Sequence, residues 1–360
     1  MNNVKQFFST DYFTARQKFL SATTATSLRS QFTGPQGQPL YTDISYLGPK
    51  DADNLMVLVS GTHGVEGYCG SAAQLAFLHS PLADSAKKSI GILLIHALNP
   101  YGFAWDRRVT AEGCDLNRNF LDFTQPIPEN DEYRQLANYL IPPDISPAGL
   151  ADAESHIKRF RQQFGEHVFQ SARKRGQYTH ATGMFYGGRA PSESRQCLEK
   201  IVADYQIDAR KQVVIIDYHT GLGPYGYGEL QCETPSGMKG YQRALKIFGP
   251  SVTSPELGTS SSVHIIGTQD EFWQRILGDR HTYVCLEFGT YDQEKSREVL
   301  RNDHWLFTYK PEEADSERGR LIRSATRHQY YPELDDWQEM VIFRCNQIHA
   351  QAVSSLCLAE

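Results

Sequence analysis

The chain of 360 residues has no long apolar run and no excess of basic residues. No stretch approaches the ~20 apolar residues that a membrane-spanning helix needs. Residues 1–20 lack the basic stretch, apolar core and small-residue cleavage site of a signal peptide, so we expect none. A formal net charge of -6 is also unlike the basic surface typical of proteins that bind nucleic acid or anionic membranes. We therefore expect neither a nucleic-acid nor a membrane partner.

The sequence has no CxxC pair and no GxSxG motif. Its seven cysteines are scattered, which argues against a disulfide framework and favours a reduced compartment. We therefore expect a cytoplasmic protein. The missing GxSxG elbow disfavours a serine hydrolase, although Ser60 precedes a glycine-rich turn.

Apolar runs that end in turn residues predict a sheet. Some of these runs hardly alternate, which is typical of strands buried on both faces. Strands are predicted at 41–48, 54–60, 89–98, 211–221 and 282–291. Helices are predicted at 71–80, 192–205 and 335–359, and in one or two pieces over 4–30, whereas the polar and basic segment 310–332 predicts a loop. This order predicts an α/β fold with a doubly wound, mostly parallel mixed sheet flanked by helices.

Residues from about 126 to 176 differ from the rest, because they are charged and amphipathic and show no strand pattern. They predict a helical insertion, which is either a hairpin laid beside the sheet or a wall of the substrate pocket. Composition marks no flexible linker anywhere, so we expect residues 1–360 to form a single domain.

Polar side chains stand directly after four of the predicted strands. His63 and Glu66 follow the second strand and Asn99 the third, while His219 follows the run VVIIDY of the fourth and Glu287 the run TYVCL of the fifth. Ligands of open α/β sheets bind at the carboxyl ends of the strands, so we expect these side chains to gather at one edge.

Two histidines and one carboxylate are a common catalytic zinc set. His63, Glu66 and His219 supply such a set and leave a coordination position for water. Glu287 is then a free carboxylate beside the metal, which is the place of a general base. A lone histidine is more often a hydrogen-bonded structural residue, and we assign this role to His96, His180, His264, His281 and His304.

An ordered series of motifs resembles a known family. The series is HGVEG (63–67), NPYGF (99–103), RR (107–108), DLNRNF (115–120), DYHTG (217–221) and LEFGTY (286–291). It resembles the zinc carboxypeptidase superfamily, which includes succinylglutamate desuccinylase and aspartoacylase. The nearest resemblance is to a bacterial branch known only as a domain of unknown function.

The resemblance implies roles for individual residues. One zinc ion per chain would be held by His63, Glu66 and His219, with Glu287 as general base. Asp115 would orient His63, as the ring of a metal ligand usually requires.

The resemblance also implies residues that hold the substrate. Arg108 would polarise the scissile carbonyl, with Arg107 beside it as an alternative. Asn117 and Arg118 would hold a substrate carboxylate, which suits the planar guanidinium.

The sequence departs from this family in its tyrosines and at its C-terminus. Digestive carboxypeptidases carry a mobile tyrosine before the catalytic glutamate, but residues 260–276 contain none. Tyr291 is a candidate substitute in substrate binding, and Tyr225 or Tyr227 are others. The C-terminal segment predicts a helix rather than the β-rich part of aspartoacylase-like enzymes, which favours the peptidase side.

Together these features predict a zinc-dependent hydrolase that cleaves an amide bond next to a free carboxylate, of the carboxypeptidase type. The alternative is an N-acyl amino acid deacylase. A binding protein that has lost turnover is disfavoured because the ligands and the base are all present. The expected partner is a small molecule or short peptide with a free carboxylate.

Overall fold

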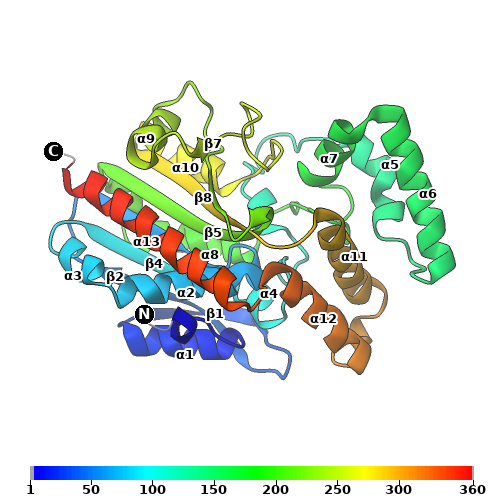
Figure 1. Cartoon of the computed structure of the whole chain (residues 1–360), viewed down its shortest axis with the longest axis horizontal. Coiled ribbons are helices and arrows are strands. Elements are labelled where there is room, and N and C mark those ends of the chain that lie inside the picture. The colour runs from blue at the N-terminus through cyan, green and yellow to red at the C-terminus, as the bar shows by residue number, and fades with distance from the viewer. Residues whose placement is uncertain (1–3, 359–360) are drawn as a thin grey trace.

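The computed structural model describes residues 4–358 and contains an eight-stranded mixed sheet in the order β1-β2-β4-β3-β5-β8-β6-β7 (Figure 1). Its centre is parallel and consists of β4 (Gly91–His96), β3 (Asn54–Val59), β5 (Gln212–Tyr225) and β8 (His281–Gly289). Antiparallel pairs join β2 to β4, β1 to β2 and β6 to β8, and the outer elements are β1 (Thr26–Thr33), β2 (Pro39–Leu47), β6 (Gly228–Gln231) and β7 (Val252–Thr253). The predicted mostly parallel mixed sheet is confirmed.

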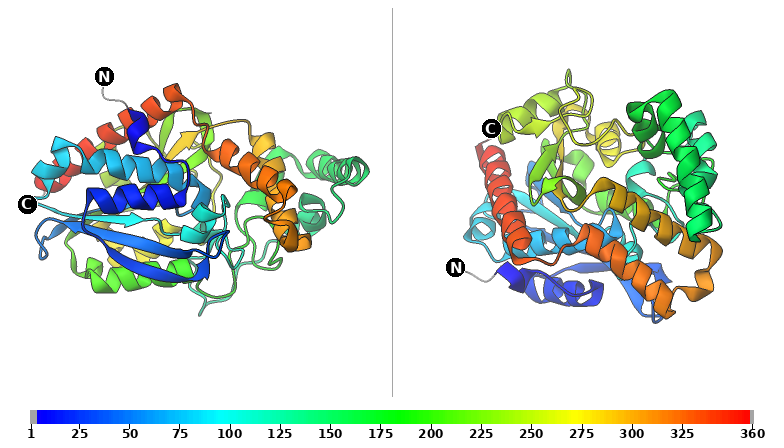
Figure 2. Two further views of the ribbon diagram at one scale, coloured as in Figure 1. Left: turned by 90° about the horizontal axis from the view of Figure 1, so that it is seen from below. Right: turned by 45° about the vertical axis from the view of Figure 1, so that its right-hand side comes forward.

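Helices cover both faces of this sheet, so side chains that alternate along a central strand enter two different cores. Leu58 packs into the first core and Val57 into the second. The first core is covered by α1 (Tyr12–Ala22), α2 (Gly67–Leu78), α9 (Lys239–Phe248) and α13 (Asp335–Leu358). The second is covered by α8 (Glu193–Asp204) and α10 (Gln269–Leu277). Figure 2 shows α1, α2 and α13 on one side of the strands and α8 on the other.

The predicted helical insertion is formed by α5 (Asp131–Leu140), α6 (Pro147–Phe164) and α7 (Glu166–Lys174). These helices lie to one side of the sheet, next to α11 (Gln293–Tyr309) (Figure 1). Arg297 and Arg301 of α11 both bind Glu154 of α6, each at 2.7 Å. The insertion is therefore tied to α11. That the whole chain forms a single domain stays a prediction.

The predicted loop at 310–332 is wrong, because it contains α12 (Glu317–Tyr330) after a 3₁₀ turn, η6 (Pro311–Glu313). The Ser316 side chain caps this helix by accepting a hydrogen bond from the Gly319 amide. The helix lacks an apolar stripe: Leu321 is 66% exposed, while Thr326 and Gln329 are among its buried residues. Because Thr326 and Gln329 share the inward face with Tyr330, the helical period of apolar residues is hard to recognise.

The prediction of helix over 4–30 is also wrong in its last part, because α1 ends at Ala22 and β1 begins at Thr26. This strand is an edge strand that pairs only with β2 and exposes much of its length. Its polar composition therefore carries little strand signal.

The predicted helices at 71–80, 192–205 and 335–359 are confirmed as α2, α8 and α13, although residue 359 lies outside the described residues. The remaining short elements are η1 (Val4–Phe7), η2 (Gly64–Glu66), α3 (Pro81–Ala86), α4 (Pro100–Ala104), η3 (Leu116–Arg118), η4 (Ile207–Ala209) and η5 (Gly278–Arg280). Within residues 4–358, no helix has the length and apolar character needed to cross a bilayer.

Candidate active site

The turn after β3 holds His63 and Glu66 in place by docking onto a distant segment. Gly64 is needed there, because a Cβ on it would lie 2.1 Å from the backbone of Gly102. The Gly64 and Val65 amides donate to the carbonyls of Arg108 and Arg107, at 3.2 and 2.9 Å. The close approach therefore brings Arg108 beside His63.

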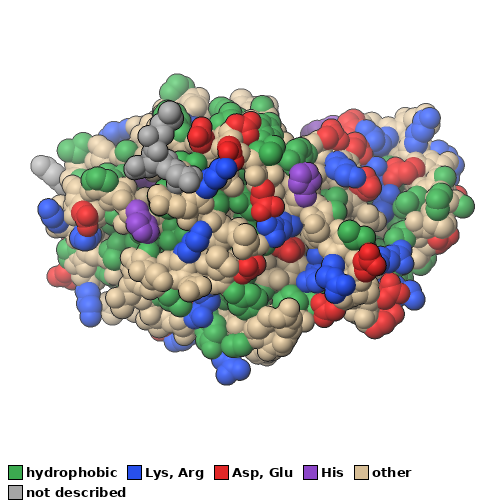
Figure 3. Space-filling view, turned by 60° about the horizontal axis from the view of Figure 1, so that its bottom comes forward, with side chains coloured by type: hydrophobic (Ala, Val, Ile, Leu, Met, Phe, Trp, Pro, Cys, Tyr) green, Lys and Arg blue, Asp and Glu red, His purple; other side chains and the backbone are tan. Residues whose placement is uncertain are grey.

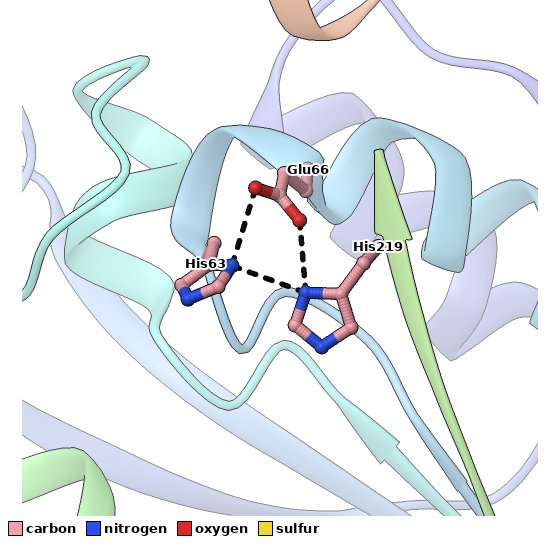
Figure 4. Close-up of side chains that lie close together, drawn as sticks. All are labelled: His63, Glu66 and His219. Atoms are coloured by element: carbon pink, nitrogen blue, oxygen red, sulfur yellow. Dashed lines mark hydrogen bonds and ion pairs between the residues drawn. The ribbon is translucent and has the colours of Figure 1, made fainter. Parts of the chain in front are cut away.

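The parallel register of β5 and β8 supplies the other candidate residues, since His219 and Glu287 are direct neighbours across these strands. Candidate ligand atoms of His63, Glu66 and His219 all lie within 4.8 Å of one another. The two Nδ1 atoms are 3.0 Å apart, and the Glu66 oxygens lie 3.2 Å from Nδ1 of His63 and 3.0 Å from Nδ1 of His219 (Figure 4). The structure thus brings the three predicted ligands together.

A carboxylate lies behind each imidazole ring. Nε2 of His63 is 2.9 Å from Oδ1 of Asp115, and Nε2 of His219 is 2.9 Å from Oδ2 of Asp217. With Nε2 protonated and bound to a carboxylate, Nδ1 of each ring presents its lone pair toward Glu66, which is the usual arrangement of metal-binding histidines. Asp115 therefore lies where the resemblance implies.

The sequence analysis missed Asp217, which is fully buried in β5. Its carboxylate accepts hydrogen bonds from Thr62, Gln269 and Tyr283 as well as facing His219. A signal was available, because residues two apart in a strand share a face and Asp217 precedes His219 by two.

The charge balance of this cluster favours a bound cation. Although burial opposes ionisation, His63, His219 and Arg108 hold the pKa of Glu66 below its ordinary value. Burial likewise acts against the His219 imidazolium, yet Asp217 and Glu66 raise the pKa of that ring well above its ordinary value. The carboxylates thus stabilise positive charge on the ring nitrogens. A nitrogen and oxygen donor set with this charge fits a zinc ion.

A second group of possible ligands overlaps the first and consists of His219, Cys285 and Glu287. Burial, together with Glu287, raises the pKa of the Cys285 thiol well above its ordinary value. Because the thiolate is the form that binds metals, this set is the weaker of the two.

Arg108 and Arg107, which the sequence left as alternatives, point in different directions. Arg108 donates to Oε1 of Glu66 at 2.8 Å and to Oδ2 of Asp115 at 3.0 Å. Arg107 is buried against Asp303, with two bonds of 2.9 Å to its two oxygens, and its guanidinium lies 3.5 Å from the Phe307 ring centre. Of these two arginines, only Arg108 therefore contacts a candidate metal ligand.

Glu287 opens into a small cavity with a volume of about 70 Å³. Its Oε1 accepts the Leu222 amide at 2.9 Å. Burial, with Glu66 nearby, raises the pKa of Glu287 to about 8. Arg108, Arg118 and Tyr330 also line this cavity. The site thus combines a proton-exchanging carboxyl group with cationic walls.

Arg118 lines the cavity, but Asn117 is not among its lining residues. The Arg118 guanidinium donates to the carbonyls of Lys174 and Asn117. These bonds use three of its five N–H groups and leave two. The Asn117 side-chain oxygen accepts the Gln269 amide at 2.8 Å. A role of Asn117 in substrate binding stays a prediction.

None of the three candidate tyrosines lines the cavity. Tyr291 stacks on His328 at 4.8 Å, Tyr225 donates to Asp336, and Tyr227 is 46% exposed. The cavity tyrosine is Tyr330 of α12, whose hydroxyl lies 3.1 Å from Ser296 Oγ. The sequence missed it because α12 itself was not predicted. A substrate role for Tyr291 stays a prediction.

Other polar residues in the predicted set have structural partners. Asn99 caps α4 through the Gly102 amide. His96 and His281 lie against Ser71 and Asp270, and His304 against the Thr182 carbonyl.

The fold and the site define an α/β protein with a doubly wound mixed sheet and a His-Glu-His cluster at the carboxyl ends of its central strands. The chain belongs to the family described as "Protein of unknown function (DUF2817)", whose profile matches residues 8–344. This confirms the predicted family of unknown function.

Several solved structures are similar to this chain at low identity. Carboxypeptidase A from Helicoverpa armigera is 12% identical with a TM-score of 0.43, and the match covers 96% of this chain and 71% of that one. Bovine thrombin-activatable fibrinolysis inhibitor is 13% identical with a TM-score of 0.41, over 88% of this chain and 92% of that one. An aspartoacylase family protein from Mesorhizobium loti is 13% identical with a TM-score of 0.37, over 74% and 61%. Among curated proteins, no sequence matches the chain.

Proposed function

We propose that this protein is a zinc-dependent hydrolase that cleaves an amide bond next to a free carboxylate, as a carboxypeptidase does. The observation that carries the proposal is the buried group of His63, Glu66 and His219, with Glu287 on the neighbouring strand and a cationic cavity beside it.

The metal would be held by Nδ1 of His63, Nδ1 of His219 and the carboxylate of Glu66. A zinc ion bound there would supply a Lewis acid for a carbonyl and would make water acidic enough to lose a proton near neutral pH. Asp115 and Asp217 keep the two rings in the orientation and tautomer that leave Nδ1 free.

Glu287 acts as the base and then as the acid. A cation held by His63, Glu66 and His219 would favour the ionised form of Glu287. In that form its carboxylate accepts a proton from the attacking water and returns it to the leaving nitrogen as the C–N bond breaks. The Leu222 amide holds Oε1 and leaves Oε2 for this exchange, apart from a 3.9 Å contact to the Cys285 sulfur.

Arg108 and Arg118 bind the substrate. Arg108 reaches from the ligands to the cavity and donates hydrogen bonds to the carbonyl oxygen as negative charge develops on it. Arg118 offers its two remaining N–H groups to the substrate carboxylate, which fixes the cleaved bond one residue away.

The test begins with the metal. The purified protein should contain about one zinc per chain. His63→Ala and His219→Ala should each lose metal and activity together while the melting curve keeps a single transition. The matched control is His281→Ala, which removes a buried histidine bonded to Asp270 and should keep the metal. If the His63 or the His219 variant keeps a full complement of zinc, that histidine is not a metal ligand. A wild-type protein that binds no metal contradicts the proposal.

An N-acyl amino acid deacylase is the second candidate, and the small cavity favours it. A volume of about 70 Å³ is only a few times the 10–15 Å³ that one water needs. Release of a C-terminal residue from peptides should be compared with hydrolysis of N-acetyl amino acids, each with a free and with an amidated carboxylate. Faster hydrolysis of peptides would support the carboxypeptidase, and faster hydrolysis of N-acetyl amino acids would support the deacylase. If neither kind of substrate is hydrolysed, the protein is a binding protein.

A further inference from the structure

Two cations of the helical insertion line the cavity beside Glu287, in addition to Arg108 and Arg118. They are Arg173 and Lys174, at the end of α7. Glu287 is the only acidic residue among the lining residues. Arg108 is paired with Glu66 and Asp115, and Arg118 lies 3.8 Å from Asp115, so Arg173 and Lys174 are the lining cations that lack an ion pair within residues 4–358. The end of the insertion thus lines this cavity, which favours the pocket-wall alternative of the two that the sequence left open.

Arg173 and Lys174 have few partners of their own. Among residues 4–358, neither forms an ion pair, although Arg173 is only 3% exposed. Arg173 donates from Nη2 to Gln170, and its Nε is buried without an acceptor. Lys174 donates only to the Gln293 side chain, at 3.3 Å. A buried cation without a counter-charge is costly, so the pocket is suited to an anion that arrives with the ligand.

The neighbouring arginines behave differently. Arg297 and Arg301, which face the same insertion from α11, share Glu154, and Arg297 also pairs with Glu294. Arg175, the next residue after Lys174, binds Glu132. Figure 3 shows acidic and basic side chains mixed over the part of the molecule that contains the insertion. The uncompensated positive charge is therefore inside the cavity rather than spread over this face.

The electrostatics of the pair agree with this geometry. Burial, together with the charges of Arg173 and Arg108, lowers the pKa of Lys174 to about 8. Burial also lowers the pKa of Arg173 to about 10, with a contribution from Arg297. The acidic groups that oppose this effect on Arg173 are Glu294 and Glu166, and neither forms a hydrogen bond with it. An anion in the cavity would lower the free-energy cost of burying these two positive charges.

We propose that Arg173 and Lys174 form a subsite for the side-chain carboxylate of the substrate residue, so that the enzyme prefers substrates that release aspartate or glutamate. This inference rests on the proposed function, in which Arg118 holds the main-chain carboxylate of the same residue. The side-chain carboxylate of an acidic amino acid then supplies the counter-charge that Arg173 and Lys174 lack.

The experiment measures product binding, which does not depend on turnover. The zinc-loaded wild-type protein is titrated calorimetrically with L-glutamate and L-glutamine, then with L-aspartate and L-asparagine. Each pair has nearly the same shape and differs in one charge. We expect each acidic amino acid to bind about tenfold more tightly or better, because a charge-assisted hydrogen bond replaces a neutral one. Equal affinity within a pair overturns the proposal.

Variants assign the preference to the two residues. Arg173→Gln and Lys174→Gln should each weaken glutamate binding about tenfold and leave glutamine binding within about twofold. Arg175→Gln is the matched control, since it removes a neighbouring charge that is already paired with Glu132 and should change neither affinity. Melting curves add a second readout: removing an unpaired buried cation should keep or raise the melting temperature, whereas removing a structural cation lowers it.

The remaining outcomes separate this inference from the proposed function. An equal loss of glutamate and glutamine affinity in Arg173→Gln would mean that this arginine holds the main-chain carboxylate, which overturns the proposal. A wild-type protein that prefers glutamate over glutamine but hydrolyses no peptide and no N-acyl amino acid would support the subsite and contradict the hydrolase.

Discussion

Asp217→Asn tests whether the carboxylate behind His219 tunes a metal site. Oδ2 of Asp217 faces Nε2 of His219 at 2.9 Å and also accepts from Gln269 and Tyr283, both at 3.0 Å. Oδ1 meets only the Thr62 hydroxyl, at 2.8 Å. An asparagine keeps every bond to the Oδ2 position, and its NH₂ group faces a hydroxyl that is able to accept. The variant should therefore fold normally.

The expected effect follows from the loss of one negative charge. The bond from His219 Nε2 changes from charge-assisted to neutral, and charge-assisted hydrogen bonds are roughly twice as strong. Removing such a partner typically lowers metal affinity 10- to 100-fold, or about 1.4–2.7 kcal/mol. Zinc affinity is measured by competition with a chromophoric chelator at fixed pH, with a denaturation curve on the same sample.

The matched control is Asp270→Asn. Asp270 is also a buried carboxylate paired with a histidine, since its Oδ1 lies 2.9 Å from Nε2 of His281. His281 is not in the candidate metal group, so this variant should lower stability without changing zinc affinity. Equal zinc affinity in Asp217→Asn and wild type, or an equal loss in both variants, would refute the reasoning.

Three further predictions concern the base, the carboxylate grip and the dependence of stability on pH. Glu287→Gln should lower kcat by about 10²–10⁴-fold or more and keep the zinc, because the amide is nearly isosteric but cannot exchange the proton. The kcat and the zinc content are measured on one preparation, and a near-normal kcat would show that Glu287 is not the base. Arg118→Ala should raise KM at least tenfold for substrates with a free carboxylate, and Arg118→Lys should not restore it fully, since an ammonium cannot form two parallel bonds; an unchanged preference over amidated substrates counts against this role. Burial raises the pKa of Asp106 to about 6 from its ordinary 3.8, so the folded state binds this proton more tightly than the unfolded chain does. The stability that Asp106 contributes is present below pH 3.8 and is lost as the pH rises through about 6, a change of about 3 kcal/mol. Asp106→Asn should remove this change from the unfolding free energy measured by urea denaturation at a series of pH values. If the unfolding free energies of wild type and variant depend on pH in the same way, Asp106 does not titrate as expected.

The positions of the candidate ligands and of the candidate base were predictable from the sequence for a local reason. A buried strand shows as an unbroken apolar run, and the polar residue that follows it must stand at the carboxyl edge of the sheet. His63, Glu66, His219 and Glu287 all satisfy this rule, and parallel pairing then brings them together. The order of motifs added the family, which the match over residues 8–344 confirms.

The local sequence pattern did not predict the elements in which the buried residues are polar or the strand is largely exposed. The helix α12 turns polar residues inward, so its period is invisible, and Tyr330 was lost with it. The edge strand β1 is covered by little, so its composition resembles a loop or helix. Both elements are stabilised by contacts with distant segments, which the local sequence does not contain.

What the sequence by itself determined is the set of candidate ligands and the candidate base, because each follows an apolar run that specifies a central strand. What only the tertiary structure decided is which cations face those groups. Arg107 and Arg108 are adjacent in sequence, yet one is bound to Asp303 of α11 and the other to Glu66. Arg173 and Lys174 lie far along the chain in an insertion, and they reach the cavity only because α7 ends beside Arg118. The direction of a long side chain depends on the partners that the fold supplies, and no local pattern contains them.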